Sequence, residues 1–226
     1  MKNIKTESGK QIFLTVQRSL AFAGWGIFFA GVFLFSLYTI QPNLIYHAFG
    51  RFTDWPIFYT GWAFFAESAS KAGGLSEYAA AFLSQWYYYS PVGAAIIAVF
   101  AVLLTILTDR LIINLGLKLL RILSCIPAVM LLSIQSRYEH QLDCYLSLII
   151  TLILLLTYTK ISFSNNLFRA MLVILTSAFL SYLAGFGAAF IFILSAGLFE
   201  SLTRKNYLFG EFCILAAVAA YASVYN

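Results

Sequence analysis

The feature that most constrains this chain is a series of uncharged apolar runs, each about as long as a membrane crossing. Residues 20–40 hold no charged side chain and follow a segment, residues 1–19, that carries three lysines and one arginine. The run is too long for the apolar core of a cleaved signal peptide, which is typically about 7–15 residues. About 20 residues cross the hydrocarbon core of a bilayer. We therefore expect an uncleaved first transmembrane helix.

Similar runs recur along the rest of the chain. They cover residues 92–108, 144–159 and 170–199 without a charged side chain, and residues 207–225 with Glu211 as the one charge. Residues 111–135 are a compound segment. Its first part has Asn114, Lys118 and Arg121 on one stripe and is expected to enter along the membrane surface. Pro127 predicts a kink in the apolar run that follows, because proline breaks the helical hydrogen-bond ladder. Residues 170–199 are bordered by basic residues on both sides, which requires an even number of passes. We therefore divide this run at Gly185-Phe186-Gly187, although one tilted span or a re-entrant pair is also compatible with its length.

Composition supports the same class of fold. The chain is 62% hydrophobic and 10% charged, with a mean hydropathy of +0.86. Soluble domains carry about 25% charged residues, so these charges are too few to cover a soluble globule of this size. We predict an all-α, polytopic transmembrane helix bundle of about seven spans, forming a single domain over residues 1–226.

The basic residues predict the orientation of this bundle, because cytoplasmic loops are enriched in Lys and Arg. With a cytoplasmic N-terminus, eleven basic residues fall in cytoplasmic segments and three in external ones. The eleven are Lys2, Lys5, Lys10, Arg18, Arg110, Lys118, Arg121, Lys160, Arg169, Arg204 and Lys205, and the three are Arg51, Lys71 and Arg137.

The external segment 41–90 is long and unusually aromatic. Between Tyr46 and Tyr89 it contains six Tyr, three Trp and six Phe. Because Trp and Tyr concentrate at membrane interfaces, we predict two amphipathic surface helices with a bend at Gly73-Gly74; a re-entrant hairpin is the alternative. The expected helices are residues 56–67, capped by Thr53 or Asp54, and residues 76–89, capped by Ser76.

Two polar groups on the external face are candidates for chemistry. The first pairs Arg51 with Asp54, three residues apart and near His47, and the second comprises Arg137, Glu139, His140 and Asp143. Carboxylates bind divalent cations or act as bases, and Arg binds phosphate. The simpler interpretation is that Asp54 caps a helix and that the second group is a solvated turn between spans.

Other features exclude function classes. No nucleotide-binding, metalloprotease, hydrolase or C-x-x-C motif occurs, and the basic residues are too scattered for nucleic-acid binding. No charge lies deep within an expected span, which disfavours an ion-coupled transporter. Glu200 and Glu211 are expected to pair with Arg204 and Lys205 near the cytoplasmic boundary. Cofactor and metal requirements stay open.

Three stretches resemble an uncharacterised family of bacterial polytopic membrane proteins, a domain of unknown function. They are GGLSEYAAAFLSQWYYYSPVGA (73–94), LLRILSCIPAVMLLSIQSRYEHQLDCYLSLI (119–149) and SYLAGFGAAFIFILSAGLFE (181–200). The family usually has Pro before the paired glycines, where this chain has Ala72. The resemblance implies location in the bacterial plasma (inner) membrane. Members of that family are longer, so the resemblance also implies that this chain is either the N-terminal part of a longer protein or the product of a split gene.

The arrangement is also distantly similar to membrane-embedded transferases of lipid-linked sugars, which use an acid in the first external loop. That likeness assigns Asp54 as the catalytic acid, with Arg51, Arg137, Glu139, His140 and Asp143 binding the substrate. This loop carries one acid at that place rather than a pair.

Two functions follow as alternatives. A non-catalytic membrane subunit or scaffold predicts that the polar residues are scattered or paired locally, with the aromatic helices as a docking surface. A transferase-like module predicts that Asp54 and the 137–143 segment converge on a pocket open to lipid. The expected partners are the bilayer and either other membrane subunits or a lipid-linked substrate.

Overall fold

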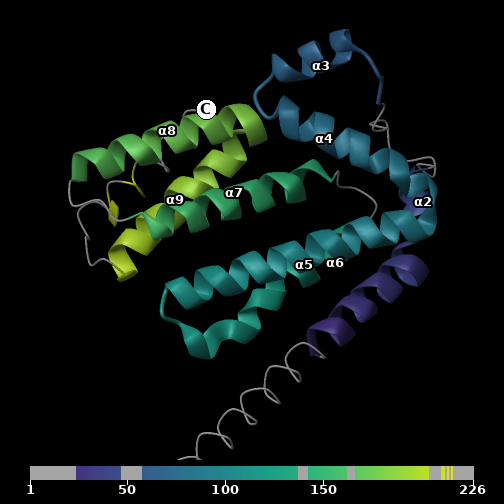
Figure 1. The fold of residues 1–226 in the computed structure, drawn as a ribbon, viewed down its shortest axis with the longest axis horizontal. Coiled ribbons are helices and arrows are strands. Elements are labelled where there is room, and N and C mark those ends of the chain that lie inside the picture. The colour runs from purple at the N-terminus through teal and green to yellow at the C-terminus, as the bar shows by residue number, and fades with distance from the viewer. Residues whose placement is uncertain are drawn as a thin grey trace, which may run out of the picture.

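The computed structural model describes residues 24–46, 58–136, 142–161 and 166–203, together with Gly210, Glu211, Cys213 and Leu215. The regular elements within these residues are all helices, as the apolar runs predict. Four of the helices are long and apolar enough to cross a membrane, and they lie alongside one another in Figure 1. They are α5 (Ser90–Asn114), α7 (Asp143–Lys160), α8 (Asn166–Ala184) and α9 (Phe186–Thr203).

Helix α5 continues past the charged residues that were expected to end it. The sequence predicts an end at Asp109, but the helix runs to Asn114. Asp109 is buried, and both of its carboxylate oxygens accept hydrogen bonds from the Arg121 guanidinium at 2.8 Å. Because a bidentate Arg neutralises the carboxylate, the charge does not need to reach water at that point and the helix continues.

The compound segment 111–135 divides differently from the prediction: its first residues, up to Asn114, complete α5, and two short helices follow. A 3₁₀-helix, η3 (Lys118–Cys125), follows a turn at Gly116, and α6 (Ile126–Gln135) continues from it. Pro127 lies in the first turn of α6. A proline is tolerated there because that N–H has no partner within the helix, so the predicted kink takes the form of a helix start.

The predicted break in the long apolar run is confirmed. Helix α8 ends at Ala184 and α9 begins at Phe186, with Gly185 between them at φ 89°. A positive φ is open to glycine without a steric cost. The two helices extend beyond residues 170–199 on both sides, to 19 and 18 residues, and each is therefore long enough to cross a bilayer.

The aromatic segment forms short helices whose boundaries differ from the predicted ones. They are α2 (Pro42–Tyr46), α3 (Trp62–Ala69), α4 (Gly74–Ser84) and the 3₁₀-helix η2 (Gln85–Tyr88). Helix α3 starts six residues later than predicted, and Gly61 is its N-cap, so neither Thr53 nor Asp54 caps it. Helix α4 is capped by Gly73, while the Ser76 hydroxyl donates to the Gly73 carbonyl from inside the first turn.

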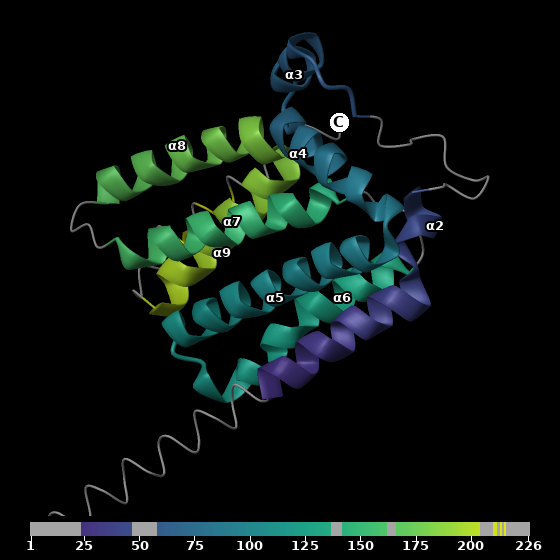
Figure 2. The ribbon, with the colours of Figure 1, turned by 45° about the vertical axis from the view of Figure 1, so that its right-hand side comes forward.

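The N-terminal apolar run is helical over Gly24–Ile40 and closes with a five-residue π-helical turn, η1 (Ser36–Ile40). Figure 2 shows this purple helix beside α5 and α6. Val32 packs there in a small apolar cluster with Ala98, Ala101 and Ala128, whose short side chains allow close approach. The predicted span 207–225 lies almost entirely outside the described residues.

The helix ends gather at two opposite ends of the bundle. At the first, which we call the aromatic end, the segment from α2 to η2 meets the start of α5 and the α8–α9 turn; Ser90 donates to Asn43 there at 2.8 Å. At the second, the basic end, the C-terminal part of α5 meets that of α7, and Asn114 donates to Thr159 at 3.0 Å. Arg110, Arg121, Lys160 and Arg169 belong to the basic end, whereas Lys71 is the one basic residue described at the aromatic end.

Candidate functional site

Three distant parts of the chain meet at the aromatic end. The backbone N–H of Gly73 donates to the carbonyl of Tyr182 at 2.9 Å. The Ser147 hydroxyl, on α7, donates to the Ser76 hydroxyl at 3.2 Å. A Cβ atom on Gly73 would lie 3.1 Å from the Cα of Gly185. Each contact joins two of the three sequence stretches 73–94, 119–149 and 181–200, so these stretches form one junction in space.

The junction depends on two glycines in the left-handed conformation. Gly73 has φ 81° and Gly185 has φ 89°, and both turns were expected from the sequence. Their contact was not expected, because no spacing rule links residues so far apart. Side chains at either position would strain the backbone, and a side chain on Gly73 would also press on the backbone of the α8–α9 turn. The glycines therefore hold the start of α4 against that turn.

The predicted site residues are described only in part. Asp143 lies half-buried in the first turn of α7, where a carboxylate is favoured by the free N–H groups of the helix start. The others lie outside the described residues: Arg51, Asp54, Arg137, Glu139 and His140. Convergence of Asp54 with the 137–143 segment accordingly stays a prediction.

The most deeply buried charge in the described residues was not singled out as a site by the sequence. Glu200, near the end of α9, is 0% exposed. Its carboxylate accepts a hydrogen bond from the Tyr158 hydroxyl at 2.8 Å, and it pairs with Arg169 of α8 at 3.3 Å. A buried carboxylate needs such partners because desolvation otherwise disfavours its charge. We call these three residues the Glu200 cluster.

The expected partners of Glu200 were Arg204 and Lys205, which lie outside the described residues. Sequence did contain a signal for Arg169. It precedes Gly185 by 16 residues and Glu200 follows Gly185 by 15. Two antiparallel helices that turn at Gly185 bring together residues at nearly equal separations from it, so the position of the turn predicts this pair.

A second group of buried polar atoms makes no hydrogen bond in the described part of the chain. Its members near the aromatic end are the side-chain oxygens of Ser36, Tyr87, Gln135 and Tyr145. Burial raises the pKa of Tyr87, with a smaller contribution from nearby Tyr145. The Tyr87 hydroxyl consequently stays protonated to a higher pH than is usual for tyrosine. It lies in the core as a neutral polar group.

The described residues also form a shallow groove between the first helix and α6. Its volume is about 490 Å³, and Phe35, Val129, Leu132, Ser133 and Ser136 line it. The two serine hydroxyls are already bonded to the carbonyls of Val129 and Ser133. The groove therefore presents a largely apolar surface. Its lining includes no acidic or basic side chain, and both of its hydroxyl groups donate to backbone carbonyls.

Metal-binding geometry is likewise not found in the part of the chain that the structure describes: no three His, Cys, Asp or Glu side chains gather there. Neither curated proteins nor solved structures yielded a match to this chain. A family model described as "Family of unknown function (DUF6057)" matches residues 16–225. This match covers most of the chain and all three stretches of the junction, and the chain therefore belongs to the DUF6057 family of unknown function.

Proposed function

We propose that this chain is a multi-pass protein of the bacterial plasma membrane with about seven spans. Support comes from the four long apolar helices and from the apolar helix Gly24–Ile40, which begins at the edge of the described residues. Much of α8 is exposed, with apolar side chains such as Leu175 and Ile174 pointing outward. Exposed side chains of this kind are stable facing lipid and costly facing water.

In this proposal the basic end faces the cytoplasm and the aromatic end faces outward. The described basic residues favour this orientation, because cytoplasmic segments are enriched in Lys and Arg. The basic end holds Arg110, Arg121, Lys160 and Arg169, whereas Lys71 lies at the aromatic end. The orientation places the N-terminus in the cytoplasm. It also makes α3 and α4 the two surface helices of the external segment.

The proposed role is that of a non-catalytic membrane subunit or scaffold. The observation that carries it is the local pairing of buried charge within the described residues. Glu200 is held by Arg169 and Tyr158, and Asp109 is held by Arg121. Catalytic acids and bases are instead poised in a cleft with a perturbed environment. The paired charges join helices, which is a structural use.

Orientation can be tested with cysteines in a background without Cys125, Cys144 and Cys213. Glu77→Cys reports on the aromatic end, and Lys160→Cys reports on the basic end; both positions are exposed. We expect a membrane-impermeant maleimide to label Glu77→Cys in intact cells and Lys160→Cys only after permeabilisation. The reverse labelling would overturn the orientation, and full release of the protein by alkaline carbonate would overturn membrane insertion.

The role can be tested by native mass spectrometry of the purified chain with a polyprenyl phosphate. A scaffold is expected to bind this lipid no better than a phospholipid of similar charge, and equally in Asp54→Asn and Arg137→Ala. Preferential binding that is lost in both variants would reject the scaffold and favour the transferase-like alternative. Glu67→Gln, at an exposed acid of α3, is the matched control.

A further inference from the structure

Helix α3 has little cover from the rest of the described chain. It has no buried residue, and it exposes Trp62 by 80% and the preceding Tyr59 by 63%. Figures 1 and 2 both show it beyond α4, to the side of the helix bundle. Exposing large aromatic rings to water is unfavourable. This surface therefore calls for an apolar or partly apolar neighbour.

The side of α3 that faces α4 is firmly attached. Phe64 and Phe65 pack their rings against Tyr78 of α4, with ring centroids 5.8 and 5.3 Å apart. At the far end of α3, the Tyr182 hydroxyl of α8 donates to the Ala69 carbonyl at 2.8 Å. These contacts fix the level of α3 at the end of α8, close to the α8–α9 turn. In a membrane-spanning bundle this level is the boundary between lipid and water.

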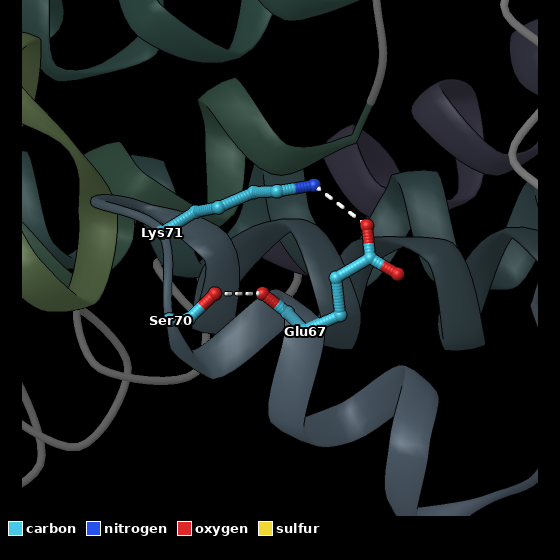
Figure 3. A network of polar contacts seen from close by, with 3 residues as sticks. All are labelled: Glu67, Ser70 and Lys71. Atoms are coloured by element: carbon cyan, nitrogen blue, oxygen red, sulfur yellow. Dashed lines mark hydrogen bonds and ion pairs between the residues drawn. The ribbon is translucent and has the colours of Figure 1, made fainter.

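The outward side of α3 divides into an aromatic part and a charged part. Trp62 and Glu67 are five residues apart, which places them about 140° apart around a helix. Glu67 forms an ion pair with Lys71 at 3.1 Å, and the Ser70 hydroxyl donates to the Glu67 carbonyl, as Figure 3 shows. The charged groups thus satisfy one another in water, on the opposite side from Trp62. A helix divided in this way suits the surface of a bilayer.

The rest of the aromatic end has the same character. The described Tyr and Trp side chains that are exposed all belong to this end: Tyr38, Tyr59, Trp62, Trp86, Tyr88, Tyr89 and Tyr182. Rings with one apolar face and one polar atom are enriched at the interface between lipid tails and water. The exposed face of α3 is continuous with this surface in chemistry and in level.

We propose that α3 lies sideways in the outer headgroup region of the bilayer, with Trp62 and Tyr59 inserted among phospholipids and the Glu67–Lys71 pair facing water. The inference rests on the proposed membrane function and names the partner of this surface, a phospholipid interface rather than another protein. Insertion is shallow, about 5–10 Å into the headgroup and acyl boundary. The helix sets the depth of the bundle on its outer side.

The test uses the full chain in phosphatidylcholine vesicles that contain lipids brominated at different depths, which quench nearby Trp fluorescence. The emission of Trp62 is obtained by subtracting the fluorescence spectrum of Trp62→Phe from that of the native chain. We expect this emission to be blue-shifted, quenched most by bromines near the headgroup and protected from aqueous acrylamide. Leu175→Trp, compared in the same way with the native chain, reports on an exposed site in the middle of α8; we expect it to be quenched most by deep bromines.

The two sites separate the possible outcomes. If acrylamide quenches Trp62 and brominated lipid does not, while Leu175→Trp responds to deep bromines, α3 faces water or a protein partner and the proposal fails. If neither site responds to brominated lipid, the membrane function itself fails. Trp62→Phe keeps an aromatic ring at the position, and equal helix content by circular dichroism shows that the comparison is between folded chains.

Discussion

Two Glu-containing ion pairs in this protein have the same chemistry and opposite surroundings. In the Glu200 cluster, the Arg169 and Glu200 side chains are 14% and 0% exposed, and a tyrosine hydroxyl donates to the same carboxylate. At the end of α3, the side chains of Lys71, in the following turn, and of Glu67 are 61% and 67% exposed. Burial decides what each pair contributes, because water screens the second pair and does not reach the Glu200 carboxylate of the first. The first joins three helices, and the second keeps one side of a surface helix in water.

The largest effect should follow from removing the cation of the buried pair. Arg169→Met leaves Glu200 charged and buried, and breaking such a pair costs about 3–5 kcal/mol of folding free energy. Denaturant unfolding in detergent micelles measures this loss. Adding Glu200→Gln to the same chain should restore much of it, whereas Arg110→Met, at an exposed position of the same end, should change little. A loss equal to that of Arg110→Met would contradict the assigned role of the cluster.

A smaller effect is expected from the tyrosine of the same cluster. Tyr158→Phe removes a hydrogen bond to a charged acceptor, which is worth about 1.5–3 kcal/mol. Tyr87→Phe is the matched control, because the Tyr87 hydroxyl is buried without a hydrogen bond in the described structure. Its removal should be neutral or slightly stabilising. Equal losses in the two variants, measured by the same unfolding assay, would mean that the hydroxyl of Tyr158 contributes nothing specific.

The attachment of α3 and α4 to the bundle can be weakened without changing either residue of the Glu67–Lys71 pair. Gly73→Ala places a side chain in a left-handed conformation, at a cost of about 1–2 kcal/mol, and presses it on the α8–α9 turn. We expect faster amide exchange and easier proteolysis in α3 and α4, while α5 and α7 stay protected. Gly187→Ala, where a Cβ meets nothing within 4 Å, should leave both measurements unchanged. Unchanged exchange in Gly73→Ala would refute the junction.

The smallest effect should come from the exposed pair itself. Lys71→Met removes an i, i+4 ion pair that is worth roughly 0.3–0.5 kcal/mol, and salt should reduce even this contribution. Unfolding at low and high salt measures both. A loss comparable with that of Arg169→Met would show that the two pairs are not separated by burial as described.

Sequence patterns predicted the helices better than the contacts between them. The uncharged runs located α7 closely, and Gly185 marked the α8–α9 break, because membrane length and glycine geometry are local constraints. The end of α5 was misplaced because Asp109 looked like a boundary until its partner Arg121 was known. The start of α3 was misplaced because Thr53 and Asp54 resembled helix caps, whereas Gly61 is its cap.

The candidate site shows the same difference between local patterns, which were predicted, and contacts between distant residues, which were not. The junction joins residues with no common spacing, and the Glu200 cluster requires knowing which helices are antiparallel neighbours. The nearly symmetric positions of Arg169 and Glu200 about Gly185 made one contact accessible to prediction. Where a contact depends on packing rather than on a local pattern, a single sequence contains too little information to locate it.

The contact between Ala69 and Tyr182 joins residues 113 positions apart, which has a consequence for how the protein is made. A ribosome completes the aromatic segment long before it reaches the turn against which that segment rests. During this interval α3 and α4 have no bundle to hold them, and their aromatic rings need another apolar surface. A membrane interface would supply such a surface. Early contact with lipid would then cover the aromatic rings until the α8–α9 hairpin has been synthesised and packs against the segment.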